Sequence, residues 1–276
     1  LDEEALSTIV VSACELQEMG RYGIKSGGLA LFFFDFNYET DGCTNPTEEP
    51  AFQSVLGCSL RARREQSDLL LLEAFEPIPE DYNVYFAGWN RSANAPANSA
   101  HVHHPRGDIK KISLDEQPAE IFASTIFWNN DITTPENHHF KVVYDVGTHE
   151  IGSSGGGLFD ESGHLVGQLH GGFTDCNLFI AYFGRFNLSW TGGGSPATSL
   201  QSWLDPGQTG AMTLDGIENP SSNATAVLSG KIALADGRGL SNATVSLVGE
   251  NKTAVTDLAG NFLFEAMPVG KTYTLL

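Results

Sequence analysis

The sequence has few basic residues for its length. Fifteen lysines and arginines stand against 34 aspartates and glutamates in 276 residues, so the formal net charge is −19 at pH 7. Binding to nucleic acid needs clustered positive charge that contacts phosphates, so we expect no nucleic-acid partner. No apolar run reaches the ~18 residues of a membrane-spanning helix. The polar start LDEEALS lacks the pattern of a secretion signal. We therefore expect no membrane span.

Cysteine is also scarce, and its spacing argues against zinc. The four cysteines are at positions 14, 43, 58 and 176, and no two of them have the CxxC spacing of a zinc site. Disulfide bonds of a secreted protein are the interpretation we prefer. A bridge between Cys43 and Cys58 is one pairing that the sequence leaves open. The chain starts with Leu rather than Met and stops in a strand-like segment, so we expect both ends to be cut.

Glycine and proline are plentiful by contrast, with 30 and 12 residues. Short runs rich in valine, isoleucine, phenylalanine and leucine alternate with turn-forming residues from residue 29 to residue 172. This pattern is typical of an all-β barrel or sandwich, and few helices are expected. The segment SLQSWL, residues 199–204, has apolar residues at helical spacing and predicts a short closing helix.

Changes in composition divide the chain into three parts. We expect residues 1–204 to form one domain and residues 205–226, which are rich in turn formers, to be a linker. Residues 227–276 alternate apolar and polar positions between turns. Through the motif TDLAGNF they resemble the carboxypeptidase regulatory-like β-sandwich modules appended to many secreted bacterial enzymes. The resemblance implies an accessory module that lacks its final strand or strands.

A serine flanked by glycines lies in the stretch GSSGG, residues 152–156. Glycines allow a tight turn in which backbone N–H groups converge on one point, which is the arrangement of an oxyanion hole. A serine hydroxyl is a poor nucleophile at neutral pH and needs an adjacent base, usually an imidazole oriented by a carboxylate. The stretch suggests a nucleophilic serine, but a plain loop rich in glycine and serine would have the same composition.

Seven motifs occur in order between about Ala30 and Gly210. They are FNYETDGC, SDLLLLE, FAGWNRS, HHPRGDIKKIS, GSSGG, GQLHGG, and YFGRF followed by SW and LQSWLDP. In this order and at this spacing they resemble the trypsin-like serine peptidases, specifically the bacterial lysyl endopeptidases. The resemblance implies a trypsin-like double β-barrel, lacking the front of its first barrel, followed by the partial β-sandwich.

The same resemblance implies catalytic residues. Ser154 matches the nucleophile, and the amides of Gly152 and Ser154 match the oxyanion hole. Asp68, just ahead of the leucine run in SDLLLLE, matches the carboxylate that orients the catalytic histidine. The partners of the cysteines that match Cys43 and Cys176 lie near the N-terminus in this family. No metal and no cofactor are implied.

A substrate pocket is implied as well. Trp128 and His170 match a stacked indole and imidazole that line the pocket, with Gly171 beside them. In the family an acidic residue shortly before YGR pairs with the lysine of the substrate, whereas Ala181 occupies that position here. An apolar pocket does not offset the desolvation of a lysine ammonium. We therefore expect an active form to prefer uncharged residues, although Asp175 is a nearby alternative acid.

The first hundred residues contain no histidine. In the resembling family the base precedes the carboxylate, in a TAxHC-like segment that ends a strand. The nearest segment here, STIVVSAC, has Ala13 where the imidazole belongs. Three explanations are open: the front of the chain is truncated or garbled, the chain is an inactive relative that keeps the fold, or another group replaces the histidine.

Three functions follow from these features. The first is a secreted bacterial serine endopeptidase that hydrolyses polypeptides through an acyl-enzyme at Ser154. The second is an inactive pseudopeptidase that binds polypeptide, or a surface or matrix partner through its C-terminal module. The third is a metal hydrolase, because an HxHH cluster can hold zinc, but HHP is a structural loop feature of the resembling family. Its ligands would come from His101, His103, His104, His138 and His139.

Overall fold

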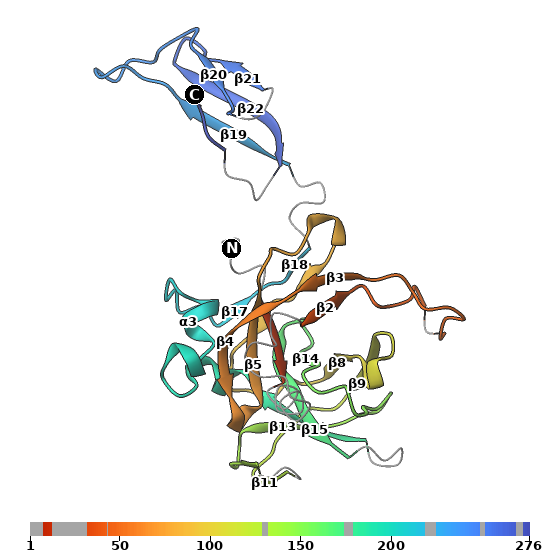
Figure 1. Ribbon diagram of the computed structural model, residues 1–276. Coiled ribbons are helices and arrows are strands. Elements are labelled where there is room, and N and C mark those ends of the chain that lie inside the picture. The colour runs from red at the N-terminus through yellow and green to blue at the C-terminus, as the bar shows by residue number, and fades with distance from the viewer. Residues whose placement is uncertain are drawn as a thin grey trace. The chain divides into compact units, whose positions relative to one another are not determined.

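The computed structural model describes residues 8–12, 32–42, 44–128, 132–173, 179–218, 225–248, 252–268 and 273–276. The chain divides into two compact units, Leu1–Ile217 and Glu218–Leu276. Both are built mainly of strands (Figure 1). In the described ranges no helix is both long and apolar enough to cross a bilayer.

The leucine run of the first unit forms a buried central strand. β5 (Leu69–Ala74) lies between β1 (Thr8–Ser12) and β4 (Cys58–Arg64), and both pairs are antiparallel. Leucines 69–72 are at most 1% exposed, because apolar side chains cover both faces of β5. One face packs against Phe34 and the other against Phe186, Trp190 and Leu200. A continuous apolar run of this length is typical of such a strand.

The remaining strands before residue 99 are short. We call residues 8–98 the first half of this unit and residues 99–217 the second half. In the first half, β2 (Phe33–Phe36) pairs with β3 (Gln53–Leu56). β6 (Tyr85–Phe86) pairs with β18 (Ile217–Glu218), and β7 (Trp89–Asn90) pairs with β17 (Thr213–Leu214) and with β15 (Leu165–Gly172) of the second half.

The second half is organised around one antiparallel sheet with the strand order β10-β13-β16-β15-β14-β8-β9. Two short helices follow it, and β11 and β12 form a separate hairpin. The bounds are β8 (Ser99–His103), β9 (Lys111–Asp115), β10 (Glu120–Ile121), β11 (Ile126–Phe127), β12 (Thr133–Thr134), β13 (His139–Val143), β14 (Gly157–Phe159), β15 (Leu165–Gly172), β16 (Ile180–Arg185), α2 (Phe186–Thr191) and α3 (Gln201–Leu204).

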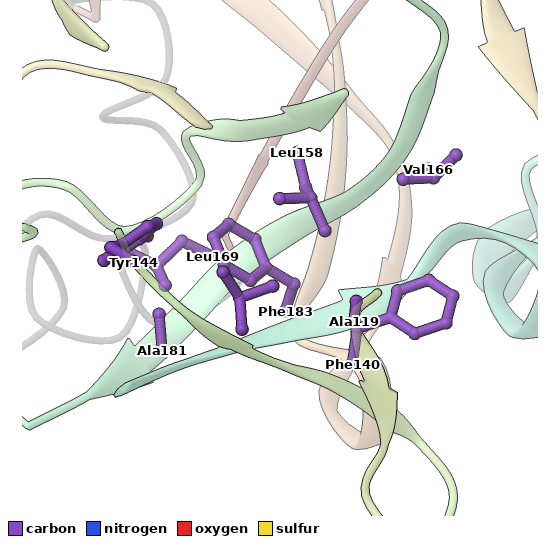
Figure 2. Packing of buried hydrophobic residues seen from close by; sticks show 9 residues of the cluster. Ala119, Phe140, Tyr144, Leu158, Val166, Leu169, Ala181 and Phe183 are labelled. Carbon is purple, nitrogen blue, oxygen red and sulfur yellow. The ribbon is translucent and has the colours of Figure 1, made fainter. Parts of the chain in front are cut away.

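The core of the second half lies on one face of this sheet. Figure 2 shows Leu158, Leu169 and Phe183, from three neighbouring strands, converging with Phe140 and Ala181. All five are at most 1% exposed. Burying a side chain of leucine or phenylalanine size contributes about 1.5–3 kcal/mol, so this cluster holds the sheet rigidly beneath the loops at its edge.

Close contacts join the two halves where β5 begins. The side-chain amide of Gln168 on β15 donates to the carbonyl of Ser67 at 2.6 Å, and the hydroxyls of Ser67 and Ser189 are 2.7 Å apart. Gly184 on β16 lies so near that an added Cβ would be 1.7 Å from the Ser67 oxygen. Only glycine allows this approach, and it holds the start of β5 against β15 and β16.

The second unit has its own small core. β19 (Thr225–Lys231) pairs with β22 (Asn261–Pro268), and β20 (Thr244–Ser246) pairs with β21 (Thr253–Val255). The buried side chains are Val245, Leu247, Phe262, Phe264 and Met267. This unit contains no histidine and no tryptophan.

The all-β prediction is confirmed, and α3 lies within the segment expected to form the closing helix. The expected linker, residues 205–226, spans the division between the units, but its first part is not free of structure. β17 and β18 lie in it and pair with strands of the first half, because Leu214 packs on the core around Trp89. Cys58 is buried, whereas the other three cysteines lie outside the described residues, so the expected disulfide bonds stay a prediction.

Candidate active site

Ser154 lies in a tight turn between β13 and β14. The amide of Ser153 donates to the carbonyl of Glu150 at 3.0 Å, and the amide of Gly155 donates to Leu169 on β15 at 2.8 Å. Gly152 and Gly155 have φ angles of 91° and 84°, in the left-handed region that favours glycine. The glycines of the GSSGG stretch therefore give the turn its shape.

Two amides of this turn are available to an incoming acceptor. Among the described residues, neither the N–H of Gly152 nor that of Ser154 donates a hydrogen bond to a carbonyl or a side chain. The Ser154 hydroxyl is half-buried and lies 3.5 Å from the carbonyl of His170 on β15. A half-buried hydroxyl flanked by two unused amides is the donor arrangement that stabilises an oxyanion.

A directional chain of hydrogen bonds fixes the turn. Ser113 Oγ donates to the carbonyl of Thr148 at 2.7 Å, so it accepts from His103 Nε2–H at 3.2 Å. His103 Nδ1 is then an acceptor for the hydroxyl of Ser153 at 2.8 Å. Ser153 Oγ in turn accepts from the Glu150 amide at 3.1 Å. Burial, and then the charge of His149, lowers the pKa of His103 to about 4, which keeps this tautomer neutral at pH 7.

Asp68 lies against the same strand as Ser154. It follows the 3₁₀ turn η3 (Glu65–Ser67), is 2% exposed and has a φ of 52°. The preceding residue, Ser67, accepts from Gln168, and Ser154 contacts the carbonyl of His170 two residues further along β15. Residues two apart on a strand are about 7 Å apart. Ser67, the residue before Asp68, and Ser154 therefore contact residues of β15 that are two positions apart.

The segment expected to carry the base ends beside Asp68. β1 pairs with β5 from Thr8–Glu73 to Ser12–Leu69, and Leu69 directly follows Asp68 in the chain. Ala13, the next residue after Ser12, lies outside the described residues, as does Asp175. The described part of β1 thus ends opposite Leu69, the residue that follows Asp68.

None of the histidine rings takes the place of that base at Ser154. All eight histidines lie in described ranges, and no ring nitrogen of theirs is hydrogen-bonded to Ser154. His170 reaches Ser154 only through its backbone carbonyl. The ring of His170 points instead to His139, with Nδ1 and Nε2 of the two rings 2.9 Å apart.

Trp128 and His170 are stacked. Their ring centroids are 3.8 Å apart at 21°, and the indole N–H donates to Thr134 Oγ1 at 2.9 Å. Gly171 lies under the same ring, since an added Cβ would be 3.0 Å from the Trp128 side chain. Burial lowers the pKa of His170 to about 3, so the stacked imidazole is neutral at pH 7. These three predicted residues form one surface beside Ser154.

Ala181 lies on the other face of its strand. Its side chain is fully buried in the core cluster with Phe140 and Phe183 (Figure 2). Side chains alternate along a strand, so the neighbouring Tyr182 faces Trp128, at 6.3 Å between ring centroids. Tyr182 is a residue of this surface that sequence reasoning missed, and the buried His139, considered from the sequence only as a metal ligand, lies behind the surface against His170. The period-2 pattern of IAYFGR was the signal that could have identified Tyr182.

The histidines proposed as metal ligands do not converge. His101 Nδ1 is bound to the hydroxyl of Tyr144, His103 to two serines, and His104 Nδ1 to the carbonyl of Asp108. In the part of the chain that the structure describes, no group of three or more histidine, cysteine, aspartate or glutamate residues is placed to hold a metal ion. The HxHH stretch serves packing and the hydrogen-bond chain of the turn.

The strand topology, the serine turn and the buried aspartate define an all-β protein of the trypsin-like peptidase class. The sequence pattern of the family described as lysyl endopeptidase, C-terminal domain, matches residues 24–181, which is more than half of the chain. The chain belongs to this family.

A curated relative agrees with this assignment. A lysyl endopeptidase of Pseudomonas aeruginosa is 33% identical over 125 residues, which cover 44% of this chain and 25% of the relative. The chain thus matches about a quarter of the length of that relative.

Solved structures of proteases are similar to parts of this chain at low identity and low TM-score. Deg5 is 15% identical, with a TM-score of 0.40 over 66% of this chain and 74% of its own. The MamO protease domain of Magnetospirillum magneticum is 9% identical, with a TM-score of 0.38 over 65% and 78%. Rv3671c of M. tuberculosis H37Rv is 17% identical, with a TM-score of 0.33 over 48% and 60%. The fold assignment rests on the family match and the strand topology.

Proposed function

We propose that this chain carries the polypeptide-binding and acyl-transfer site of a secreted bacterial serine endopeptidase, with Ser154 as the nucleophile. The hydroxyl of Ser154 attacks the scissile carbonyl, the amine half of the substrate leaves, and water hydrolyses the ester that remains on Ser154. The amides of Gly152 and Ser154 hold the oxyanion of each tetrahedral intermediate. No metal and no cofactor take part.

One observation carries the proposal. The Ser154 hydroxyl and its two unused amides lie at β15 beside the Trp128–His170 stack, and Ser67, which precedes Asp68, contacts the same strand. The N–H groups of Gly152 and Ser154 donate to no described residue, so they are free to donate to the oxyanion of a bound substrate.

The base is the missing part of the site. The residue that follows Ser12, the last residue of β1, is alanine in the sequence. Removing one member of a catalytic triad lowers the rate by roughly 10⁴–10⁶. We therefore expect the chain with this sequence to bind polypeptide and to hydrolyse it extremely slowly.

The same observation favours a second candidate function, a pseudopeptidase. In that case the protein binds polypeptide without cleaving it, and the second unit binds a surface or matrix partner. The strand and turn pattern of residues 227–276 supports an accessory module of this kind.

The experiment that separates the two candidates restores the base. Ala13→His should raise hydrolysis of an unstructured protein substrate by at least about 10³-fold, and mass spectrometry should find a fluorophosphonate adduct on Ser154. The controls are Ala13→His combined with Ser154→Ala, and Ala13→His combined with Asp68→Asn. If Ala13→His folds, as judged by its circular dichroism spectrum, and stays inert towards both substrate and probe, the endopeptidase proposal is wrong.

The specificity follows from the same strand. Because Ala181 is buried in the core and brings no acid to the Trp128 surface, cleavage by the restored variant should follow uncharged residues. A peptide-library digest checks this, and products that end mostly in lysine would contradict it. Secretion is tested separately, by looking for the protein in the culture medium.

A further inference from the structure

A hollow of about 270 Å³ lies on the first unit, away from the Trp128–His170 stack. This volume is just below the range of small-molecule sites and fits a single side chain. Three rings and two carboxyl groups surround it. The lining residues are Asp35, Tyr38, Glu49, Phe52, His104 and Gly107.

The hollow adjoins the Ser154 turn on the flank opposite β15. On one flank, the Gly155 amide is bound to Leu169 of β15. On the other flank, the Arg106 amide donates to the carbonyl of Ile151 at 2.8 Å, and an added Cβ on Gly152 would be 3.5 Å from the Gly107 nitrogen. Gly107 is therefore both a wall of the hollow and a neighbour of the proposed oxyanion amide.

The walls are suited to a cation. Tyr38 is stacked on His104, with ring centroids 6.3 Å apart at 21°, and meets Phe52 edge-on at 5.5 Å. Burial lowers the pKa of His104, so its ring adds no positive charge at pH 7. Aromatic rings attract ammonium and guanidinium groups, and a nearby carboxylate adds to this attraction.

Among the described residues, the carboxylates of the hollow accept hydrogen bonds from hydroxyl groups. Asp35 accepts from Ser54, and Glu49 accepts from the Tyr38 hydroxyl at 3.4 Å. The basic residues nearby are paired with other acids, which reduces their repulsion of a cation in the hollow. These pairs are Lys110 with Glu39, Lys111 with Asp108, and Arg106 with Glu150.

We infer that this hollow is a subsite for a basic side chain, lysine or arginine, on the leaving-group side of the substrate. The inference rests on the proposed function of Ser154. If the residue before the scissile bond enters beside His170, the chain that follows it crosses the turn and passes over Gly152 towards His104 and Gly107. The family's lysine recognition would then be replaced by recognition of a basic residue on the other side of the bond.

The test is equilibrium binding to the full chain. A fluorescein-labelled, uncharged octapeptide is prepared with one lysine at each position in turn, and with norleucine at the same positions. At one position of the octapeptide, the peptide with lysine should bind about fivefold more tightly than the peptide with norleucine. Glu49→Gln and Asp35→Asn should each reduce that preference to less than about twofold.

A matched control separates the hollow from the net charge of −19, which attracts any basic peptide. Glu76→Gln removes the same charge at an exposed position outside the hollow, and the lysine preference should survive it. Equal binding of lysine and norleucine peptides, or an equal loss in Glu76→Gln and Glu49→Gln, would overturn the inference.

Protection of Ser154 against fluorophosphonate labelling distinguishes the endopeptidase proposal from the subsite proposal. The preferred lysine peptide should slow fluorophosphonate labelling of Ser154 in Ala13→His. Peptides that protect Ser154 with no lysine preference leave the endopeptidase proposal intact and refute the subsite. A lysine preference without protection refutes the subsite as part of the substrate path. No labelling of Ser154 under any condition refutes the proposed function itself.

Discussion

The two halves of the first unit bury different kinds of side chain. The first half surrounds a leucine strand, and residues before 101 include no histidine. All eight histidines lie between residues 101 and 170, and five of them, His101, His103, His139, His149 and His170, are at most 4% exposed. The first half, where the proposed function would require a basic imidazole, has no histidine, and the second half keeps its buried histidines neutral. The stability of the two halves should therefore respond differently to acid.

The largest expected effect is acid destabilisation. Burial lowers the pKa of His103 to about 4 and that of His170 to about 3, against 6.5 when unfolded. The unfolded chain therefore binds more protons below pH 6.5, and stability falls as pH falls towards these folded values. Each of these two histidines should cost roughly 2 kcal/mol between pH 7 and pH 5, so together they should lower the free energy of unfolding by about 4 kcal/mol.

Urea unfolding followed by tryptophan fluorescence measures this effect. All four tryptophans lie in the first unit, so the signal reports on that unit. The range from pH 7 to pH 5 lies above the usual titration of carboxyl groups, so histidines dominate it. An unfolding free energy that stays constant between pH 7 and pH 5 would contradict the assignment of neutral buried histidines.

The second effect tests the leucine strand. Leu71→Ala removes a fully buried side chain and should lower the free energy of unfolding by about 3 kcal/mol, at both pH 7 and pH 5. Leu60→Ala is the matched control, because Leu60 is 44% exposed on β4 and should cost less than about 1 kcal/mol. If the loss of unfolding free energy in Leu71→Ala differed strongly between pH 7 and pH 5, the two halves would not respond separately to acid.

The smallest effect tests the junction. Ser67→Ala removes the hydroxyl that pairs with Ser189 across the two halves and should cost about 1 kcal/mol, because it leaves a buried hydroxyl with fewer partners. Ser189→Ala and the double variant complete a cycle. A coupling energy near zero in urea unfolding would mean that this bond does not join the halves energetically.

The sequence predicts the site where local chemistry determines the structure. The glycines around Ser154 need left-handed backbone, so the turn can be predicted from five residues. The leucine run after Asp68 likewise predicts a buried strand. Motif order identifies the Trp128–His170 pair, whose stacking the structure describes.

Contacts between distant residues were harder to foresee. The pairing of His139 with His170 and of His103 with Ser153 depends on strand register, and no local pattern encodes it. Ala181 shows the same limit, since matching a motif gives a position in the chain but not the face of the strand. The hollow beside Gly107 draws its walls from residues 35–52 and from residues 104–107, which only the fold brings together.

The left-handed backbone at Asp68 narrows what can replace that residue. With a φ of 52°, the position suits glycine, asparagine and aspartate and strains longer side chains. Aspartate is thus the one acid that this bend tolerates without strain, and glutamate would keep the charge but distort the bend. In lineages that abandon the charge, asparagine or glycine should appear here, and either residue would mark a protein that has given up catalysis while keeping its architecture.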